Sequence, residues 1–116
     1  MTNDTGLITL VQQARFFFNH PAGIDIYIAR VGSRRAGYLL LRQTANTVFI
    51  TEAVDQPFRR NGLAISMVRF AQALHANLTA EILSTNTASI GLHLHAGFTY
   101  AGQHDDIQSF RFTRPA

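Results

Sequence analysis

The sequence contains no cysteine, tryptophan or lysine, so all ten of its basic residues are arginine. Without cysteine the chain has no disulfide framework, no thiol nucleophile and no cysteine-ligated metal site. It also lacks a long hydrophobic run, because the longest aliphatic stretch, residues 38–41, is far too short to span a bilayer. No basic flank precedes the first apolar residues, which argues against a secretory signal and predicts a cytoplasmic location.

The remaining composition is that of one globular domain over residues 1–116. The 116 residues are 47% hydrophobic and 15% charged, which is enough to form a single core. The formal net charge of +3 is compatible with nucleic-acid binding. However, the arginines are dispersed except for the pairs Arg34–Arg35 and Arg59–Arg60, and no basic stripe alternates with aromatic residues. Nucleic-acid binding is therefore a minor alternative.

Hydrophobic periodicity predicts an α+β chain built around a sheet. The first three strands are expected to form an antiparallel meander, and the strand–helix–strand order that follows indicates a parallel pair. Asn77 is expected to cap the end of the central helix, and Gly97 to close the next helix in the left-handed conformation. The expected elements are a helix over residues 7–18, strands over 24–28, 36–42 and 48–54, a helix over 63–76, a strand over 79–83, a helix that begins at 86 or 87, and a hairpin of 98–102 with 108–113.

The segment between the third strand and the central helix has the features of a phosphate-binding turn. A helix N-terminus carries unpaired backbone N–H groups and a partial positive charge, and a glycine there lets an anion approach the backbone. The adjacent arginines Arg59 and Arg60 add charge, and Gly62 supplies the glycine. The pattern is neither the Walker nor the dinucleotide motif, because it has a single glycine and no phosphate-binding lysine.

Two blocks of the sequence resemble the GNAT superfamily of N-acetyltransferases. The spacing of Val54, Arg59, Gly62 and Ala64 is similar to the acetyl-coenzyme A signature of that superfamily, Gln/Arg-x-x-Gly-x-Gly/Ala after a strand that ends in valine. The block over residues 86–98 resembles its later signature, an asparagine that opens a short helix closing on Gly-Phe. Within this block, residues 86–93 particularly resemble phosphinothricin-type acetyltransferases, whereas residues 94–96 depart from the usual charged residues. The resemblance covers roughly residues 48–102.

The resemblance implies the GNAT fold, a mixed and mostly antiparallel central sheet flanked by helices, and acetyl-coenzyme A as co-substrate. It implies that the strand end at Val54 pairs with the pantetheine arm and that Asn86 lies near that arm. Tight packing of a helix on the sheet is the alternative explanation for the small residues of the turn, and an N-cap role is the alternative for Asn86. The residues implied to hold the pyrophosphate are Arg59, Arg60, Asn61, Gly62, Leu63 and Ala64.

Two further residues are candidates for acid–base chemistry. Glu52 lies on the third strand, two residues before Val54, where a carboxylate suits the general base that removes a proton from an ammonium group. His93 stands where many members of the superfamily have a tyrosine thought to protonate the departing thiolate, and histidine is a competent acid near neutral pH. The alternatives are an exposed charge on a sheet edge for Glu52 and a histidine stabilised by a helix dipole for His93. A metal site on His93 and His95 is disfavoured, because their spacing places them on different helix faces.

The resulting functional hypothesis is an N-acetyltransferase that moves an acetyl group from acetyl-coenzyme A to a small-molecule or peptide amine by direct attack. The alternatives are a non-catalytic acyl-coenzyme A binder on the same fold and a basic nucleic-acid-binding or toxin-like module. Superfamily members usually begin with a strand and two helices that wall the acceptor site, whereas here only about 23 residues precede the first clear strand. The first strand is therefore expected to be missing or very short, and the acceptor is not identified. An uncovered apolar surface, at the sheet edge or at Phe16–Phe17–Phe18, predicts a homodimer.

Overall fold

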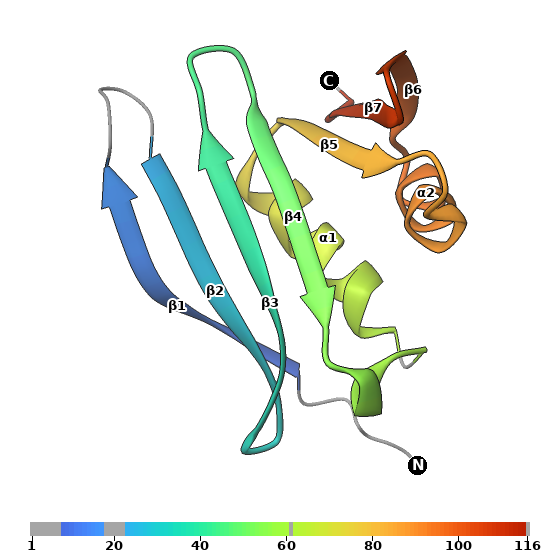
Figure 1. Cartoon of the computed structure of the whole chain (residues 1–116). Coiled ribbons are helices and arrows are strands. Elements are labelled where there is room, and N and C mark those ends of the chain that lie inside the picture. The colour runs from blue at the N-terminus through green and yellow to red at the C-terminus, as the bar shows by residue number, and fades with distance from the viewer. Residues whose placement is uncertain (1–7, 18–22, 61, 116) are drawn as a thin grey trace.

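The structure, a computed structural model, describes the backbone of residues 8–17, 23–60 and 62–115, with side chains over 9–12, 23–60 and 62–115. In chain order the elements are β1 (Ile8–Phe17), β2 (Gly23–Val31), β3 (Arg34–Gln43), β4 (Val48–Val54), the 3₁₀ turn η1 (Gln56–Phe58), α1 (Leu63–Leu74), β5 (Asn77–Leu83), α2 (Thr87–His95), β6 (Thr99–His104) and β7 (Ile107–Thr113) (Figure 1). Neither of the two described α-helices is long and apolar enough to cross a membrane.

The described strands form one seven-stranded sheet in the order β1-β2-β3-β4-β5-β7-β6 (Figure 1). Only β4 and β5 run parallel to each other, and every other neighbouring pair is antiparallel. The expected meander, the parallel pair joined through α1 and the closing hairpin are therefore confirmed. A mixed, mostly antiparallel sheet flanked by helices is the α+β architecture that the sequence predicted.

The beginning of the chain differs from the expectation. The helix predicted over residues 7–18 is wrong, because Ile8–Phe17 forms β1, antiparallel to β2, while residues 7 and 18 lie outside the described part. The expectation that the first strand is missing or very short is also wrong, since β1 has 10 residues. The register of β1 shifts between Gln12 and Ala14. Such a bulge interrupts the alternation of period two, so the apolar residues on its two sides mimic helical spacing.

The end of α1 also differs in detail. Asn77, predicted as its C-cap, is instead the first residue of β5. The cap is His75, whose backbone N–H donates to Ala71 O at 2.9 Å. Gly97, with φ of 95°, closes α2 in the left-handed conformation as predicted.

Both helices pack on the same face of the sheet and enclose the core. Buried residues of β3, β4 and β5 meet the apolar stripe of α1, and Phe98 and Phe110 extend this core under α2. The buried strand and helix residues at its centre are Leu39, Leu41, Ile50, Met67, Val68, Ala71, Leu78, Ala80 and Ile82. Because side chains alternate along a strand, the strand residues that lie between these buried ones point to the opposite face of the sheet.

The opposite face, called the open face here, is covered by neither α1 nor α2. Half-buried apolar side chains of β2, β3 and β4 lie on it, namely Ile24, Ile26, Ile28, Tyr38, Leu40 and Phe49. On β2 the residues that face the helices are instead Asp25, Tyr27 and Ala29. Asp25 is only 3% exposed and accepts hydrogen bonds from Gln12 Nε2 at 2.6 Å and Gln43 Nε2 at 3.0 Å, which satisfy the buried carboxylate.

Candidate active site

The parallel strands β4 and β5 form a wedge. They pair only at Val48 with Leu78 and at Phe49 with Thr79, and a contact of 2.9 Å between Thr47 Oγ1 and Thr79 Oγ1 lies at this closed end. Beyond it the two strands diverge (Figure 1). Within the described part of the chain, the rest of β4 and β5 therefore has no strand partner across the gap, which leaves backbone donors and acceptors on both edges available to a ligand.

A cavity of about 250 Å³ occupies this gap and is called the β4–β5 cavity here. It brings together three residues that the sequence singled out separately, Glu52 from β4 and Asn86 and His93 from the α2 region. The full lining consists of Ile50, Thr51, Glu52, Ala80, Glu81, Ile82, Leu83, Asn86, Ser89 and His93.

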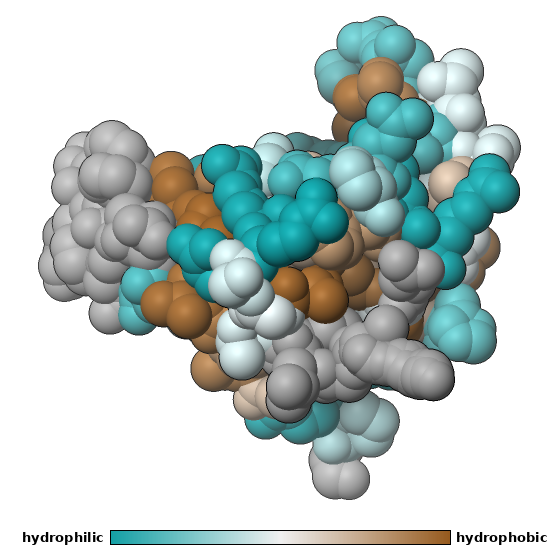
Figure 2. All heavy atoms as spheres, turned by 90° about the horizontal axis from the view of Figure 1, so that it is seen from below, coloured by the Kyte–Doolittle hydropathy of each residue, from teal (hydrophilic) through white to brown (hydrophobic). Residues whose placement is uncertain are grey.

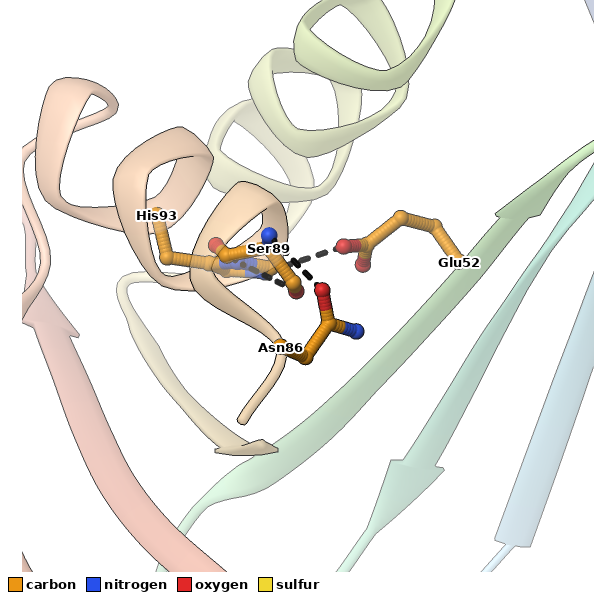
Figure 3. A network of polar contacts seen from close by, with 4 residues as sticks. All are labelled: Glu52, Asn86, Ser89 and His93. Atoms are coloured by element: carbon orange, nitrogen blue, oxygen red, sulfur yellow. Dashed lines mark hydrogen bonds and ion pairs between the residues drawn. The ribbon is translucent and has the colours of Figure 1, made fainter. Parts of the chain in front are cut away.

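Glu52 and His93 form a buried ion pair at one wall of the cavity (Figure 3). Glu52 Oε1 lies 3.0 Å from His93 Nε2, and the two side chains are 7% and 2% exposed. On the other side of the ring, His93 Nδ1 lies 2.7 Å from Ser89 O. A carbonyl oxygen only accepts, so Nδ1 carries a proton, and the carboxylate favours a proton on Nε2 as well. The geometry therefore favours the imidazolium form of His93.

The protonation of His93 reflects opposing effects. Burial lowers the pKa of His93, but the contact with the Glu52 carboxylate, the negative charge of that group and the Ser89 carbonyl raise it by more, so the pKa lies above the usual 6.5. The 3.0 Å contact is an ion pair rather than a well-directed hydrogen bond, and Glu52 Oε2 has no hydrogen-bond partner among the described residues. One buried carboxylate oxygen is thus left to accept from a ligand.

Contacts within the core fix His93 in this position. Its ring packs edge-on against Phe98, with centroids 5.0 Å apart and planes at 85°. Its carbonyl accepts from the Phe98 N–H at 3.0 Å where α2 ends. The neighbouring carbonyl of Ala96 accepts from Gln72 Nε2 at 2.7 Å and from Arg69 Nη1 at 3.3 Å. These two bonds tie the end of α2 to α1, so His93 is held by both helices.

Asn86 is the N-cap of α2, which is the alternative role that the sequence offered for it. Its side-chain Oδ1 accepts from the Ser89 N–H at 3.1 Å (Figure 3). This bond satisfies one of the unpaired N–H groups of the first turn. The role of Asn86 beside a pantetheine arm stays a prediction, although its side chain also lines the β4–β5 cavity.

A second cavity, of about 240 Å³, lies where β4 ends and α1 begins and is called the α1 cleft here. Gly62 is the N-cap of α1, with φ of 79°, and Arg60 also has a positive φ of 66°. A Cβ added to Gly62 would meet no atom within 4 Å, so backbone conformation and not tight packing requires glycine there. Asn61, the remaining predicted residue of the turn, lies outside the described residues. The lining consists of Val54, Phe58, Arg59, Arg60, Gly62, Leu63, Ala64, Ile65 and Leu92.

Positive charge gathers at this end of the molecule. Arg59 Nε donates to Val54 O at 3.1 Å, which braces the turn against the end of β4. Arg34, from the start of β3, lies with its guanidinium carbon 4.9 Å from the centre of the Phe58 ring. This contact brings the pairs Arg34–Arg35 and Arg59–Arg60 to the same end of the molecule. Figure 2 views the molecule from this end and shows hydrophobic side chains at its centre with hydrophilic ones around them.

Sequence reasoning missed several of these residues. Arg34 was noted only as part of a basic pair, and Phe58, Ile65 and Leu92 were not considered for the cleft. The sequence did show the pair Arg34–Arg35 beside a predicted hairpin turn. Its proximity to the pair Arg59–Arg60, however, depends on how β3 and η1 meet in the fold. Glu81, which lines the β4–β5 cavity, was also missed.

The sequence matches no protein-family model, and comparison with curated proteins finds no significant match. The fold does have solved counterparts. A protein assigned as a streptothricin acetyltransferase from Bacillus anthracis, solved with acetyl coenzyme A, aligns with a TM-score of 0.70 and 19% identity over 84% of this chain and 65% of that chain. The present chain thus spans less than two thirds of that protein.

Two further structures agree with this likeness. A protein assigned as a phosphinothricin N-acetyltransferase aligns with a TM-score of 0.70 and 17% identity over 79% of this chain and 72% of its own. A GNAT-family acetyltransferase from Listeria monocytogenes aligns with a TM-score of 0.65 and 14% identity over 76% of this chain and 63% of that chain. At such identities the likeness concerns the fold, and the fold of this chain is that of the GNAT acetyltransferases.

Proposed function

We propose that this protein is an N-acetyltransferase that moves an acetyl group from acetyl-coenzyme A to an amine by direct attack. The observation that carries the proposal is the buried Glu52–His93 pair in the open wedge between β4 and β5. Amide formation from a thioester needs a base that takes a proton from the amine and an acid that gives one to the thiolate. Glu52 and His93 suit these two roles, and they lie beside the unpaired edges of β4 and β5. We further propose that residues 1–116 act as one domain and that a cytoplasmic location holds.

The α1 cleft is the proposed seat of the coenzyme A pyrophosphate. Support comes from the helix N-terminus at Gly62, the positive φ values of Arg60 and Gly62, and the nearby arginines. Arg59, Arg60, Asn61, Gly62, Leu63 and Ala64 form this part of the site in the proposal, and Val54 and Asn86 flank the pantetheine arm. The Bacillus anthracis structure of the same fold contains acetyl coenzyme A, which also supports this co-substrate.

The proposed chemistry follows from the two protonation states. Glu52 accepts a proton from the acceptor ammonium through Oε2, the oxygen without a partner among the described residues. The amine nitrogen then attacks the thioester carbonyl carbon, and the carbon–sulfur bond breaks. His93 gives a proton to the departing thiolate, and the neutral imidazole that remains accepts the second proton of the amine as the amide forms. The proton held by Glu52 then passes to water, which restores both residues. No covalent enzyme intermediate is needed, consistent with a chain that has no cysteine.

A non-catalytic acyl-coenzyme A binder is the second candidate. It is favoured by the burial of His93, which is 2% exposed and already held by Glu52 and Ser89. In that case the ion pair would serve only to join α2 to β4. The α1 cleft would keep its role in binding the cofactor.

Two measurements on the purified protein test these possibilities. A thermal scan with acetyl-coenzyme A, compared with acetyl-pantetheine, which lacks the pyrophosphate, tests the cleft. Stabilisation by the first ligand alone supports it, and no shift with millimolar acetyl-coenzyme A refutes the cofactor assignment. Release of the free thiol with a panel of amines then separates an enzyme from a binder. Binding without thiol release would favour the second candidate.

A further inference from the structure

Glu81 lies on β5 and lines the β4–β5 cavity with an exposed side chain. Thr79 pairs with Phe49 of the parallel strand β4, and paired residues share a face, so Thr79 lies on the open face. Glu81 follows Thr79 by two residues and is therefore on the open face as well. Glu52 lies on the other face, with the helices. The two carboxylates thus line one cavity from opposite faces of the sheet.

Negative charge is in excess among the described residues that line this cavity. His93 is its only basic lining residue among those described, and Glu52 already pairs with it. Glu81 forms no ion pair with any described residue, although Arg111 stands opposite Thr79 on the neighbouring strand β7. The negative charge of Glu81 is therefore free to act on a ligand in the cavity.

A second feature points to a hydrogen-bond donor in the same place. The Glu52 side chain is 7% exposed, and its Oε2 has no hydrogen-bond partner among the described residues. A buried acceptor without a partner is costly, so a ligand that donates to it gains affinity. An ammonium group donates hydrogen bonds and carries the charge that both carboxylates attract.

We propose that Glu81 is a specificity-determining residue that favours acceptors with two positive charges. The amino group to be acetylated would donate to Glu52 Oε2, and the second cationic group would face Glu81 on the open side of the cavity. This inference rests on the proposed acetyl transfer and specifies its substrate class as diamines and amines with a nearby cationic group. Acceptors with a carboxylate in the second position are disfavoured.

Three acceptors with four carbons each test this directly: a diaminobutane with terminal amino groups, butylamine and an aminobutyrate with its amino group at the far end. For the wild type we expect kcat/KM to fall in that order. Glu81→Gln should reduce the preference for the diamine over butylamine by roughly three- to tenfold. Glu81→Arg should reverse the order of the diamine and the aminobutyrate. Asp105→Asn, which removes an exposed carboxylate outside this cavity, should leave all ratios unchanged.

Equal turnover of the three acceptors, or an unchanged ratio in a folded Glu81→Gln variant, would overturn the assignment. A thermal scan of each variant shows whether it is folded. If none of the three amines releases the thiol, the acetyl transfer to such amines fails, and calorimetric binding of the diamine then decides the role of Glu81. A several-fold weaker affinity in Glu81→Gln would support it, and equal affinity, or no binding to the wild type, would overturn it.

Discussion

Glu52 Oε1 lies 3.0 Å from His93 Nε2, and the two side chains are buried together between β4 and α2. The residues proposed as base and acid are therefore in direct contact. Removing Glu52 also removes the contact and the negative charge that raise the pKa of His93.

The first prediction concerns the stability that this pair provides. A histidine with a higher pKa in the folded state stabilises the fold fully below its unfolded pKa of about 6.5, and the effect is lost as pH rises through the folded pKa. Urea unfolding should therefore show a difference in free energy of unfolding between the wild type and Glu52→Gln that shrinks as pH rises above 6.5. His93→Phe leaves Glu52 buried without its partner and should cost on the order of 3–5 kcal/mol.

A matched control is available in the same chain. His104 and Asp105 lie 3.5 Å apart, but their side chains are 96% and 84% exposed. Asp105→Asn should have no measurable effect on the free energy of unfolding, because an exposed pair is screened by solvent. A difference between the wild type and Glu52→Gln that is independent of pH would contradict the proposed ion pair.

The second prediction concerns the α1 cleft. Acetyl-coenzyme A at about 100 times its Kd should stabilise the wild type by about 2.7 kcal/mol. Gly62→Glu should abolish this shift, because it puts a negative charge at a helix N-terminus where the pyrophosphate is proposed to bind. Gly102→Glu adds the same charge and also replaces a glycine with positive φ, but lies on β6, away from the cleft. Equal loss of binding in both variants would show that the effect of Gly62→Glu is not local.

The third prediction concerns Arg34. Its contact with Phe58 brings a positive charge to the edge of the α1 cleft. Arg34→Ala should raise the Kd for acetyl-coenzyme A several-fold at low salt, and the effect should diminish with salt because exposed charges are screened. Arg42 makes a similar contact with Phe49, with 4.3 Å to the ring centre, at the far end of β3. Arg42→Ala should leave the Kd unchanged, and equal effects of the two variants would argue against a role for Arg34.

The fourth prediction is a homodimer. Phe18 and the side chains of Phe16 and Phe17 lie outside the described part, but the open face carries half-buried apolar residues of three strands. A second copy packed there or on the edge strand β1 would cover this surface. Light scattering should give the mass of a dimer at micromolar concentration, and Ile26→Glu, at the centre of this face, should weaken the dimer. A monomer mass for the wild type would remove the hypothesis.

Sequence reasoning succeeded where the information is local. The end of β4 at Val54, the start of α1 at Leu63 and the helix capped by Asn86 are determined by the residue types of short segments. The parallel pair followed from element order alone. The same reasoning failed for β1, where a bulge near Gln12 breaks the period of two.

The details of the site depend on contacts between distant segments. The residues Glu52 and His93 were each singled out, but their direct pairing depends on how α2 packs beside β4. The contact between Arg34 and Phe58 likewise joins the start of β3 to the turn after β4. Glu81 gave no local signal, because an exposed carboxylate on a strand acquires meaning only from the cavity that it lines.

Acetyl transfer at the Glu52–His93 pair can be tested by following the acetyl group itself. Acetyl-coenzyme A with an isotopically labelled acetyl group is incubated with the protein and an amine acceptor, and mass spectrometry quantifies the labelled amide and free coenzyme A. We expect equal amounts of the two products from the wild type. Glu52→Gln and His93→Phe should form them more slowly by about a hundredfold or more, and the Kd for acetyl-coenzyme A should be nearly unchanged in Glu52→Gln. Label transfer at the wild-type rate in both variants, or no labelled amide with any amine, would contradict it.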